Sequence, residues 1–322
     1  MSVNFTIEEI GSYKKNLDLT IEPGAKPPKL NPDSTRYGVL EDENKLDLNL
    51  GVKEFKDNGG GEKLETILEY IKYMAEKENN WNLKKVINSD FVTTRGTIRK
   101  IAQSGCPSNE GEPDLQLIAV QRKGVIFLLS LNQKQLYLTN GLKFQQYMTL
   151  DDEGKPFDKN EPISNESAVK YVYRAKLENG RQRINLFYGA EVDAIDDDDE
   201  KVELKVICKK RGCYTPHYSI LRTYLQCLYG NVQKLVVGSR YYGTVYKVEK
   251  ISRDSLKKSS DCNNSKLNEC NSILHDVLSN IKKRLSDGKG ITANRVNGQM
   301  EYPTCEDNFD LVPDSFLSLF ES

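Results

Sequence analysis

Helical spacing of apolar residues marks four segments of the chain. In residues 62–78, leucine, isoleucine and methionine recur every three to four positions with charged residues between them, as on the buried face of an amphipathic helix. Residues 141–148, 219–229 and 272–285 also have helical patterns, the last with a basic polar face. We therefore predict four helices, and we assign the apolar stripe of residues 62–78 to core packing.

Other segments have the short apolar runs or the two-residue alternation of β-strands. The predicted strands are residues 91–101, 115–120, 125–131, 184–195, 202–208 and 234–238. Residues 91–101, a strand or a strand and a turn, carry Arg95 and Arg99. Arg122-Lys123-Gly124 reads as the turn of a hairpin between two of the other strands. Strands therefore alternate with helices along the chain, which predicts an α/β fold.

Polar segments separate or precede these elements. The first 35 residues contain four prolines and predict an extended lead-in. Residues 151–165 predict an acidic loop, and the serine- and asparagine-rich residues 259–271 predict a surface loop or a disordered segment. The sequence has no internal repeat and no clear domain boundary, so we expect one catalytic domain over residues 1–322.

Charge and cysteine content narrow the class of protein. The 322 residues contain 46 Lys and Arg against 47 Asp and Glu, a balance that argues against a protein that coats polyanions. The chain has no apolar segment long enough to span a bilayer, so we expect a soluble intracellular protein without a membrane partner. Its seven cysteines lack CxxC spacing, which favours reduced thiols over a zinc site.

The most informative segment is an acidic hairpin. Residues 196–200 are all Asp or Glu and separate the two predicted strands that flank them. If the hairpin closes around this loop, Asp193 lies roughly opposite Glu203, and Glu191 roughly opposite Lys205. One sheet face then carries three carboxylates and one lysine. Such a cluster is costly unless it is neutralised, and divalent cations are a common remedy.

The alternative is an ordinary strand pair with one face in water and one in the core. The residues of its buried face would be Val192, Ala194, Val202, Leu204 and Val206. This alternative explains the apolar positions, but it does not explain carboxylates that face carboxylates. An Asp followed about ten residues later by Glu-x-Lys is also the arrangement of many metal-dependent nucleases. We therefore interpret the hairpin as a metal site.

Several short motifs resemble, in order, those of the DXO/Rai family of RNA 5′-end quality-control enzymes, which remove aberrant caps and 5′ phosphates. The motifs are Leu46-Asp47-Leu48-Asn49-Leu50-Gly51, Phe91-Val92-Thr93-Thr94-Arg95-Gly96, Gly141-Leu142-Lys143-Phe144, Glu191-Val192-Asp193, Glu203-Leu204-Lys205, Leu225-Gln226 and Val236-Val237-Gly238-Ser239-Arg240. The resemblance covers roughly residues 36–250. It implies a PD-(D/E)xK-like nuclease core with a mixed, mainly antiparallel sheet and flanking helices.

The resemblance also implies roles for particular residues. The implied ligands of one or two Mg²⁺ or Mn²⁺ ions are Glu191, Asp193, Glu203 and the Leu204 backbone carbonyl. Lys205 and Gln226 would position the attacked phosphate or the water, and Arg95 would hold a 5′ phosphate or the RNA backbone. A structural ion pair is the alternative for Arg95. For Gln226 it is a solvated position on an amphipathic helix.

One position departs from the family pattern. The helix motif of the family ends in a glutamate that helps to bind metal, and this chain has Gln145 there, followed by Gln146. A glutamine keeps a neutral oxygen but removes one negative charge. The departure predicts weaker binding of at least one metal ion or an altered balance of activities. Complete loss of activity and an engineered change stay open as alternatives.

The expected function is hydrolysis at RNA 5′ ends. The resemblance implies removal of incomplete caps, pyrophosphate or triphosphonucleotide, with 5′→3′ exonuclease action as a further option. One alternative is a weakly active or inactive homologue that mainly stabilises a nuclear 5′→3′ exoribonuclease. Another is a DNA nuclease with similar motifs. We expect a nuclear protein, with the cytoplasm as the alternative.

Overall fold

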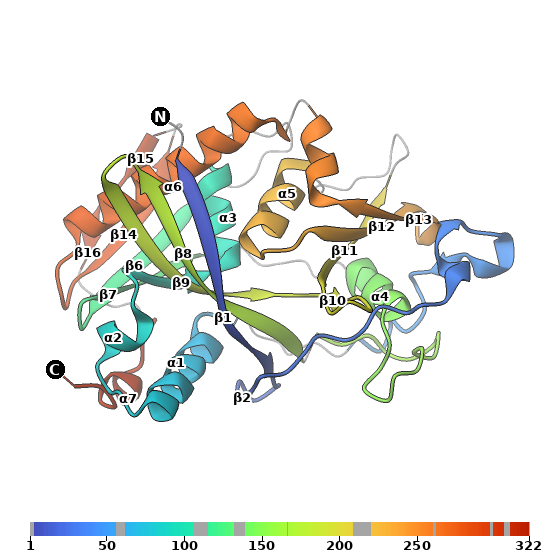
Figure 1. Cartoon of the computed structure of the whole chain (residues 1–322), viewed down its shortest axis with the longest axis horizontal. Helices are drawn as coiled ribbons and strands as arrows, with labels where there is room; N and C mark the ends of the chain where they lie inside the picture. Colours follow the sequence, from blue (N-terminus) through green and yellow to red (C-terminus); the bar gives the residue numbers. More distant parts are fainter. Residues whose placement is uncertain are drawn as a thin grey trace.

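Two β-sheets and the helices on their faces form the framework of the protein (Figure 1). The computed structural model describes residues 3–55, 62–105, 115–131, 139–165, 167–208, 220–259, 262–296, 299–305 and 310–321. Within these ranges, the larger sheet has ten strands and the smaller sheet has six. The chain passes between the two sheets more than once, and the site described below lies at the passage between residues 191 and 194.

The larger sheet combines segments from both ends and the middle of the chain. Its strands are β1 (Asn4–Lys15), β2 (Ile21–Pro23), β5 (Phe91–Thr94), β6 (Gln116–Arg122), β7 (Val125–Ser130), β8 (Ala168–Asn179), β9 (Gln182–Glu191), β14 (Gly290–Val296), β15 (Gln299–Glu301) and β16 (Thr304–Cys305). The order is β15-β14-β6-β7-β5-β9-β8-β1-β2, and β16 pairs with β14. β5 is parallel to both of its neighbours, and the other pairs are antiparallel.

The smaller sheet contains both strands that flank the acidic turn of residues 196–200. Its strands are β3 (Gly38–Val39), β4 (Leu46–Asp47), β10 (Ala194–Ile195), β11 (Lys201–Cys208), β12 (Lys234–Tyr241) and β13 (Thr244–Ser252). The order is β10-β11-β12-β13-β3, and β4 pairs with β13. β11 and β12 are parallel. The two sheets confirm the expected mixed, mainly antiparallel α/β fold.

Helices cover both faces of the larger sheet. The helices are α1 (Glu65–Glu78), α2 (Leu83–Ile87), α3 (Arg95–Gln103), α4 (Thr139–Met148), α5 (Ile220–Tyr229), α6 (Asn264–Arg284) and α7 (Asp314–Leu317), with 3₁₀ turns η1 (Ser34–Arg36), η2 (Asp42–Asn44) and η3 (Arg253–Lys258). α1, α2 and α7 share one hydrophobic cluster with the larger sheet. α3, α5 and α6 share another, which extends to the smaller sheet. Among the described residues, no helix is long and apolar enough to cross a membrane.

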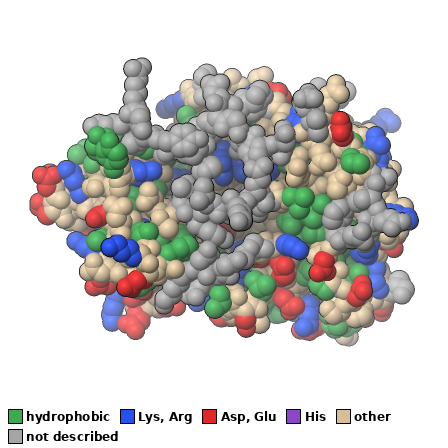
Figure 2. Space-filling model, turned by 180° about the vertical axis from the view of Figure 1, so that it is seen from behind, with side chains coloured by type: hydrophobic (Ala, Val, Ile, Leu, Met, Phe, Trp, Pro, Cys, Tyr) green, Lys and Arg blue, Asp and Glu red, His purple; other side chains and the backbone are tan. Residues whose placement is uncertain are grey.

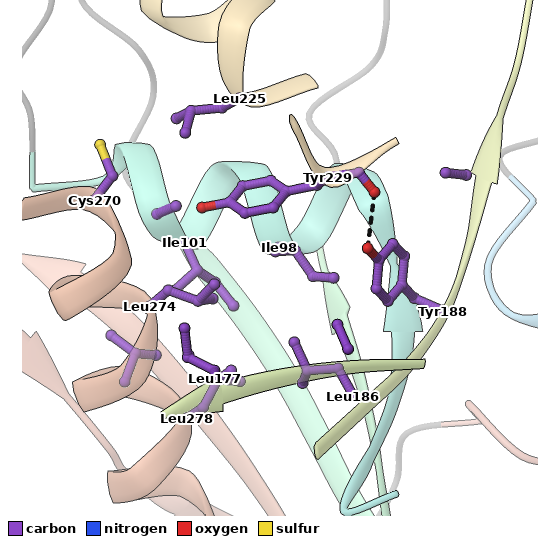
Figure 3. Packing of buried hydrophobic residues seen from close by; sticks show 14 of the residues in the cluster. Ile98, Ile101, Leu177, Leu186, Tyr188, Leu225, Tyr229, Cys270, Leu274 and Leu278 are labelled. Atoms are coloured by element: carbon purple, nitrogen blue, oxygen red, sulfur yellow. Dashed lines mark hydrogen bonds between the residues drawn. The ribbon is translucent and has the colours of Figure 1, made fainter. Parts of the chain in front are cut away.

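The second cluster joins the two sheets through helix packing. Figure 3 shows Ile98 of α3 and Leu274 of α6 beside Leu177 and Leu186 of the larger sheet. These four side chains are at most 2% exposed. Because α5 packs into the same cluster, its position relative to the larger sheet is fixed by dense apolar contacts.

The four predicted helices are confirmed as α1, α4, α5 and α6, and the hairpin of β6 and β7 is confirmed as well. Lys123 and Gly124 form its turn with φ values of 48° and 73°, the left-handed conformation that two-residue hairpin turns require. Residues 151–165 contain neither helix nor strand, as predicted. The ammonium of Lys143 donates to the carbonyls of Lys159 at 2.7 Å and Glu161 at 3.3 Å, which attaches this loop to α4.

Two predictions about polar segments are wrong. Within the first 35 residues, Asn4–Lys15 is not an extended lead-in but strand β1, because it pairs along its length with β8, more than 150 residues later in the sequence. Within residues 259–271, α6 already begins at Asn264. The side chain of Asn263 caps this helix. Leu267 and Cys270 are buried at helical spacing, so two apolar anchors among polar residues are sufficient to dock its first turns.

α4 packs closely on the smaller sheet at Gly238 of β12. A Cβ atom at this position would lie 2.5 Å from Cε2 of Phe144, and Phe144 is fully buried. We therefore expect Gly238→Ala to lower the free energy of unfolding by roughly 1–3 kcal/mol through overpacking. Chemical denaturation would measure this loss.

Gly141→Ala is the matched control on the same helix. A Cβ atom there has no neighbour within 4 Å, and alanine is the better helix former, so stability should hold or rise by up to about 1 kcal/mol. Equal unfolding free energies for Gly238→Ala and the wild type would show that the contact between α4 and β12 is loose.

Candidate active site

The chain passes from the larger sheet to the smaller sheet within two residues. β9 ends at Glu191, opposite Lys170 of β8, and β10 begins at Ala194 in the other sheet. The predicted single strand over residues 184–195 is therefore wrong, and Glu191 does not lie opposite Lys205 of β11. The alternation of side chains is the same whichever sheet a strand joins, so it could not reveal the crossing.

The acidic hairpin itself forms as predicted. β10 pairs with β11 in antiparallel register, and the amide of Asp196 donates to the carbonyl of Glu200 at 3.0 Å across the turn. Continuing this register places Asp193 beside Glu203. The Oδ2 atom of Asp193 accepts a hydrogen bond from the amide of Leu204 at 2.8 Å. The predicted pair of carboxylates therefore exists.

Glu203 is the centre of the site, and its side chain has no solvent exposure. Its Oε1 atom accepts from Nε2 of Gln226 at 2.7 Å and lies 2.6 Å from Nζ of Lys205. Its Oε2 atom accepts from Nη1 of Arg95 at 3.3 Å. Burial alone would raise the pKa of Glu203, but the charges of Lys205 and Arg95 hold it below its ordinary value.

Both faces of β11 are buried around Glu203. On the opposite face, Val202 and Leu204 are at most 4% exposed, as the sequence predicted, whereas Val206 is only half-buried. The alternative of an ordinary strand with its charged face in water is therefore wrong for Glu203. Aligned donors from three separate elements make this burial tolerable.

The pKa of Asp193 is shifted in the opposite direction to that of Glu203. Burial, together with the nearby negative charge of Glu203, raises the pKa of Asp193 to about 8. The positive charge of Lys205 and the hydrogen bond from Leu204 only partly offset this effect. Two carboxylates are thus crowded together, and one of them binds its proton unusually tightly.

Arg95 reaches Glu203 from the first residue of helix α3. Residues 91–101 are not one strand or a strand and a turn, as predicted, but strand β5 followed by this helix. Thr94 caps the helix by accepting a hydrogen bond from the amide of Thr97. Nη1 of Arg95 also donates to the carbonyl of Glu191 at 2.9 Å. The ion pair weighed as the alternative for Arg95 therefore exists, with Glu203 as its carboxylate.

Gln226 is held in place by the end of helix α5. The hydroxyl of Tyr188 donates to the carbonyl of Tyr229 at 2.8 Å, drawn as a dashed line in Figure 3. The hydroxyl of Tyr173 donates to the carbonyl of Gly230 at 2.8 Å. Both tyrosines belong to the larger sheet and bind carbonyls at the helix end, which lack helical partners. The solvated position weighed for Gln226 is wrong, since its amide binds Glu203.

A cavity of about 150 Å³ lies beside Arg95 and Glu191. Three of its lining side chains, Glu62, Lys63 and Lys170, had no role in the sequence interpretation. Lys170 lies across the strand pair from Glu191, yet its ammonium contacts Glu62. The pairing of β8 with β9 and the position of α1 bring these charges together. No local motif could have indicated them.

Comparison with known proteins assigns the chain to a family. The family described as RAI1 like PD-(D/E)XK nuclease matches residues 8–317. The chain belongs to this nuclease family. The decapping nuclease dom-3 of Caenorhabditis elegans is 30% identical over 345 residues, which cover 97% of this chain and 84% of that protein.

Solved structures show the same fold at low sequence identity. Rai1 of Candida albicans, in complex with pU5-Mn²⁺, has a TM-score of 0.73 at 16% identity, with 99% of this chain and 95% of that chain covered. Dxo1 of K. lactis, in complex with manganese, has a TM-score of 0.66 at 15% identity, with 95% of this chain and 92% of that chain covered.

Family membership confirms three predictions from the sequence. The chain is a member of the RAI1-like family, its core is the expected mixed α/β nuclease fold, and it is a hydrolase. In coarse terms it is a nuclease that processes RNA 5′ ends. The predicted roles of individual residues remain predictions.

The carboxylates of the site are the type of ligand that a divalent cation prefers. Asp193 and Glu203 provide adjacent carboxylates, and their mutual repulsion is what a cation relieves. Glu191 is exposed beside them. In the described part of the chain, however, no group of three or more His, Cys, Asp or Glu side chains is arranged to hold a metal ion. The structure thus assembles two of the three predicted carboxylates.

Gln145 lies on α4, the helix that packs on the smaller sheet. Its side chain is half-buried, and its backbone carbonyl accepts a hydrogen bond from Thr149 at 2.9 Å. Within the described ranges, Gln145 is not among the hydrogen-bond partners of Glu203. Its contribution to metal binding stays a prediction.

The ion pair of Arg95 with Glu203 should contribute strongly to stability. Arg95→Met leaves buried Glu203 with Lys205 as its remaining cationic partner, so we expect a loss of about 3 kcal/mol in the free energy of unfolding. Combining it with Glu203→Gln should give a clearly non-additive double-mutant cycle, measured by urea denaturation.

The control cycle uses Arg183 and Glu178, a pair 2.7 Å apart whose side chains are 58% and 34% exposed. Its coupling energy should stay below about 1 kcal/mol because solvent screens the charges. Equal coupling in the two cycles would argue that the pair of Arg95 with Glu203 is no more than a surface contact.

Proposed function

We propose that this protein hydrolyses phosphate linkages at RNA 5′ ends with the help of one or two Mg²⁺ or Mn²⁺ ions. The reactions would be removal of incomplete caps, pyrophosphate or triphosphonucleotide, with 5′→3′ exonuclease action as an extension, in quality control of mRNA 5′ ends in the nucleus. The carrying observation is the fully buried Glu203, bound by three donors and crowded by Asp193. The manganese and pU5 in the Candida albicans Rai1 structure support the proposal.

In this proposal, Asp193, Glu203 and the carbonyl of Leu204 hold the cation, with Glu191 as an added ligand. When bound, the cation supplies a Lewis acid and lowers the pKa of a bound water. Lys205 has three N–H donors, and its side chain is 26% exposed. One of these donors is directed at Glu203. The other two would orient a phosphate oxygen or the attacking water.

The cavity beside Arg95 is the proposed entrance for the RNA 5′ end. It combines the cations of Arg95, Lys63 and Lys170 and the N-terminus of α3 with two carboxylates, those of Glu62 and Glu191. The excess of positive charge favours a phosphate group. The guanidinium of Arg95 uses Nη1 for its contacts with Glu191 and Glu203, which leaves its other N–H groups for the substrate. Figure 2 shows acidic and basic side chains interspersed over one face of the molecule, so affinity for RNA would come from such local sites.

Gln145 favours a second candidate function. With a neutral side chain where the family motif has glutamate, the chain could bind metal too weakly for efficient hydrolysis and act mainly as a stabilising partner of a nuclear 5′→3′ exoribonuclease. The two candidates differ in a simple property, since only the first requires turnover of RNA.

A panel of RNAs with 5′ monophosphate, triphosphate, unmethylated cap and methylated cap tests the proposal. With Mn²⁺, we expect cleavage of at least one of these RNAs. Glu203→Ala should lower the rate by roughly 100-fold or more, because outer-shell partners alone contribute up to about that factor. Single-stranded DNA of equal length should compete poorly. A folded protein that cleaves none of the RNAs, but co-purifies with an exoribonuclease, would support the partner function instead.

A metal titration tests position 145. Gln145→Glu adds a carboxylate, so we expect roughly tenfold tighter Mn²⁺ binding by calorimetry. Gln146→Glu is the matched control. The side chain of Gln146 accepts a hydrogen bond from Lys143 at 2.7 Å, so a glutamate there would direct its negative charge at Lys143. Identical Mn²⁺ affinities for Gln145→Glu and the wild type would place residue 145 outside the metal site.

A further inference from the structure

Three charged side chains meet at the wall of the cavity beside Arg95. One carboxylate oxygen of Glu62 contacts the ammonium of Lys170, and the other lies 3.6 Å from the ammonium of Lys15. The side chains of Glu62, Lys170 and Lys15 are 14%, 17% and 8% exposed. Glu62 and Lys170 line the cavity, and Lys15 supports Glu62 from outside it. We call these three residues the lysine cluster.

The larger sheet places the lysine cluster next to the active site. Tyr13 of β1 is the register partner of Lys170 of β8, and Lys170 is the register partner of Glu191 at the end of β9. These side chains lie on one face of the sheet, which α1 covers (Figure 1). Lys170 and Glu191 are thus one strand spacing apart, about 5 Å. Because Arg95 binds the carbonyl of Glu191, the cavity connects the site to the lysine cluster.

The lysine cluster carries an excess of positive charge. Its two ammonium groups share one carboxylate, for a net charge of +1 (2 − 1), and Glu62 is the sole carboxylate in ion-pair contact with either lysine among the described residues. Burial alone would raise the pKa of Glu62, but Lys170 and Lys15 hold it below its ordinary value. A positive charge that is largely removed from water and not fully compensated is costly. The excess therefore indicates an anion from outside the chain.

Lys170 has a donor left for such an anion. An ammonium has three N–H donors, and two contacts account for those of Lys170 within the protein, with the carboxylate of Glu62 and, at 3.4 Å, the hydroxyl of Thr66. The hydroxyl of Thr66 also pairs with that of Tyr13 at 2.9 Å, so the partners of the ammonium are themselves held in place. The third donor would serve an occupant of the cavity.

Two glycines keep the cavity open. A Cβ atom on Gly189 of β9 would lie 3.4 Å from Oη of Tyr13 and 3.9 Å from Cδ of Lys170, so a larger side chain there would displace the lysine. A Cβ atom on Gly96 of α3 would have only Oγ1 of Thr94 within 4 Å, at 3.7 Å. Both glycines line the cavity. A glycine within a strand often marks a place where a ligand approaches closely.

The size of the cavity limits what can occupy it. Its volume is about 150 Å³, which corresponds to about five water molecules at roughly 30 Å³ each. Sites that enclose larger organic ligands begin at roughly 300 Å³. The cavity therefore has room for one or two phosphate groups, whereas the nucleoside of a cap exceeds it.

We propose that the lysine cluster binds the terminal phosphates of a 5′-triphosphate RNA, and that Lys170 is the specificity-determining residue that distinguishes this end from a 5′ hydroxyl. This inference rests on the proposed function and names the class of RNA end that the cavity fits best. Lys170 would donate to a terminal phosphate oxygen while Glu62 holds its ammonium in place. Arg95 would bind the phosphate that lies nearer to Glu203.

An ion network that only supports the fold is the alternative. It explains the contact between Glu62 and Lys170, but it does not explain a second lysine on the same carboxylate or the glycine at position 189. The two readings differ when Lys170 and Glu62 are replaced together. A structural ion pair can be exchanged for neutral side chains of similar size at little cost, whereas a phosphate site loses its donor.

The test measures how RNA affinity depends on the 5′ end. Short oligouridylates with a 5′ hydroxyl, a 5′ triphosphate or an unmethylated guanosine cap are titrated by fluorescence anisotropy in EDTA, which prevents metal-dependent cleavage. The wild type should bind the triphosphate RNA roughly tenfold more tightly than the other two. Lys170→Met with Glu62→Gln leaves the net charge unchanged. It should weaken binding of the triphosphate RNA roughly tenfold and of the hydroxyl RNA less than about twofold.

Two further variants separate a phosphate site from other effects. Lys176 is exposed on the same strand as Lys170 and does not line the cavity. Lys176→Met should therefore bind all three RNAs like the wild type, although it loses a positive charge that the double variant keeps. Gly96→Leu leaves the lysine cluster intact and fills the cavity, so it should also weaken binding of the triphosphate RNA roughly tenfold. Thermal melting checks that each variant is folded.

The outcomes distinguish this inference from the proposed function. If the double variant and Gly96→Leu keep the full preference for triphosphate RNA, the phosphate subsite is wrong, and cleavage of RNA by the wild type with Mn²⁺ would leave the proposed function standing. Equal losses for hydroxyl and triphosphate RNA, or equal affinities of the wild type for capped and triphosphate RNA, would also overturn the subsite. A wild type that shows the preference but cleaves no RNA would retain the subsite and refute the proposed function.

Discussion

The burial of one carboxylate organises this protein. Glu203 has no solvent exposure, and a buried carboxylate is tolerable only when cations and hydrogen-bond donors replace water around it. Its three partners come from the start of α3, from β11 itself and from the middle of α5. The larger sheet, the smaller sheet and a helix must therefore hold fixed relative positions. The same contacts that make the site chemically distinctive also join the two sheets.

This requirement explains structural features that lie outside the site. Thr94 caps α3 at the residue before Arg95, so the guanidinium extends from a fixed helix start. Tyr173 and Tyr188 bind carbonyls at the end of α5 and thereby hold the helix that carries Gln226. The hydroxyls of both tyrosines donate to backbone carbonyls and not to a proposed catalytic side chain. They act by setting the position of a donor whose displacement would leave a buried charge short of one partner.

The sequence predicted local features well and long-range pairings poorly. The acidic hairpin and the stripe of α1 depend on residues close in sequence, and both are present. The strand assigned to residues 184–195 failed because its two parts pair with different sheets, and Asn4–Lys15 was missed because its partner is β8. The sequence pattern alone also left two interpretations of Glu203 open, a residue on a solvated strand face or a residue of a buried site. What decided between them was the arrival of Arg95 and Gln226 from elsewhere in the chain.

Charge balance connects the hairpin to position 145. With all groups ionised, the carboxylates of Glu191, Asp193 and Glu203 face the cations of Arg95 and Lys205, for a net charge of −1 (2 − 3). A divalent cation would change this to +1, which suits a phosphate ligand. A glutamate in place of Gln145 would lower each value by one, to −2 without the cation and 0 with it. Under the proposal that residue 145 contributes to the site, glutamine would favour phosphate binding at the expense of metal binding, and its effect on turnover would depend on which of the two limits the reaction.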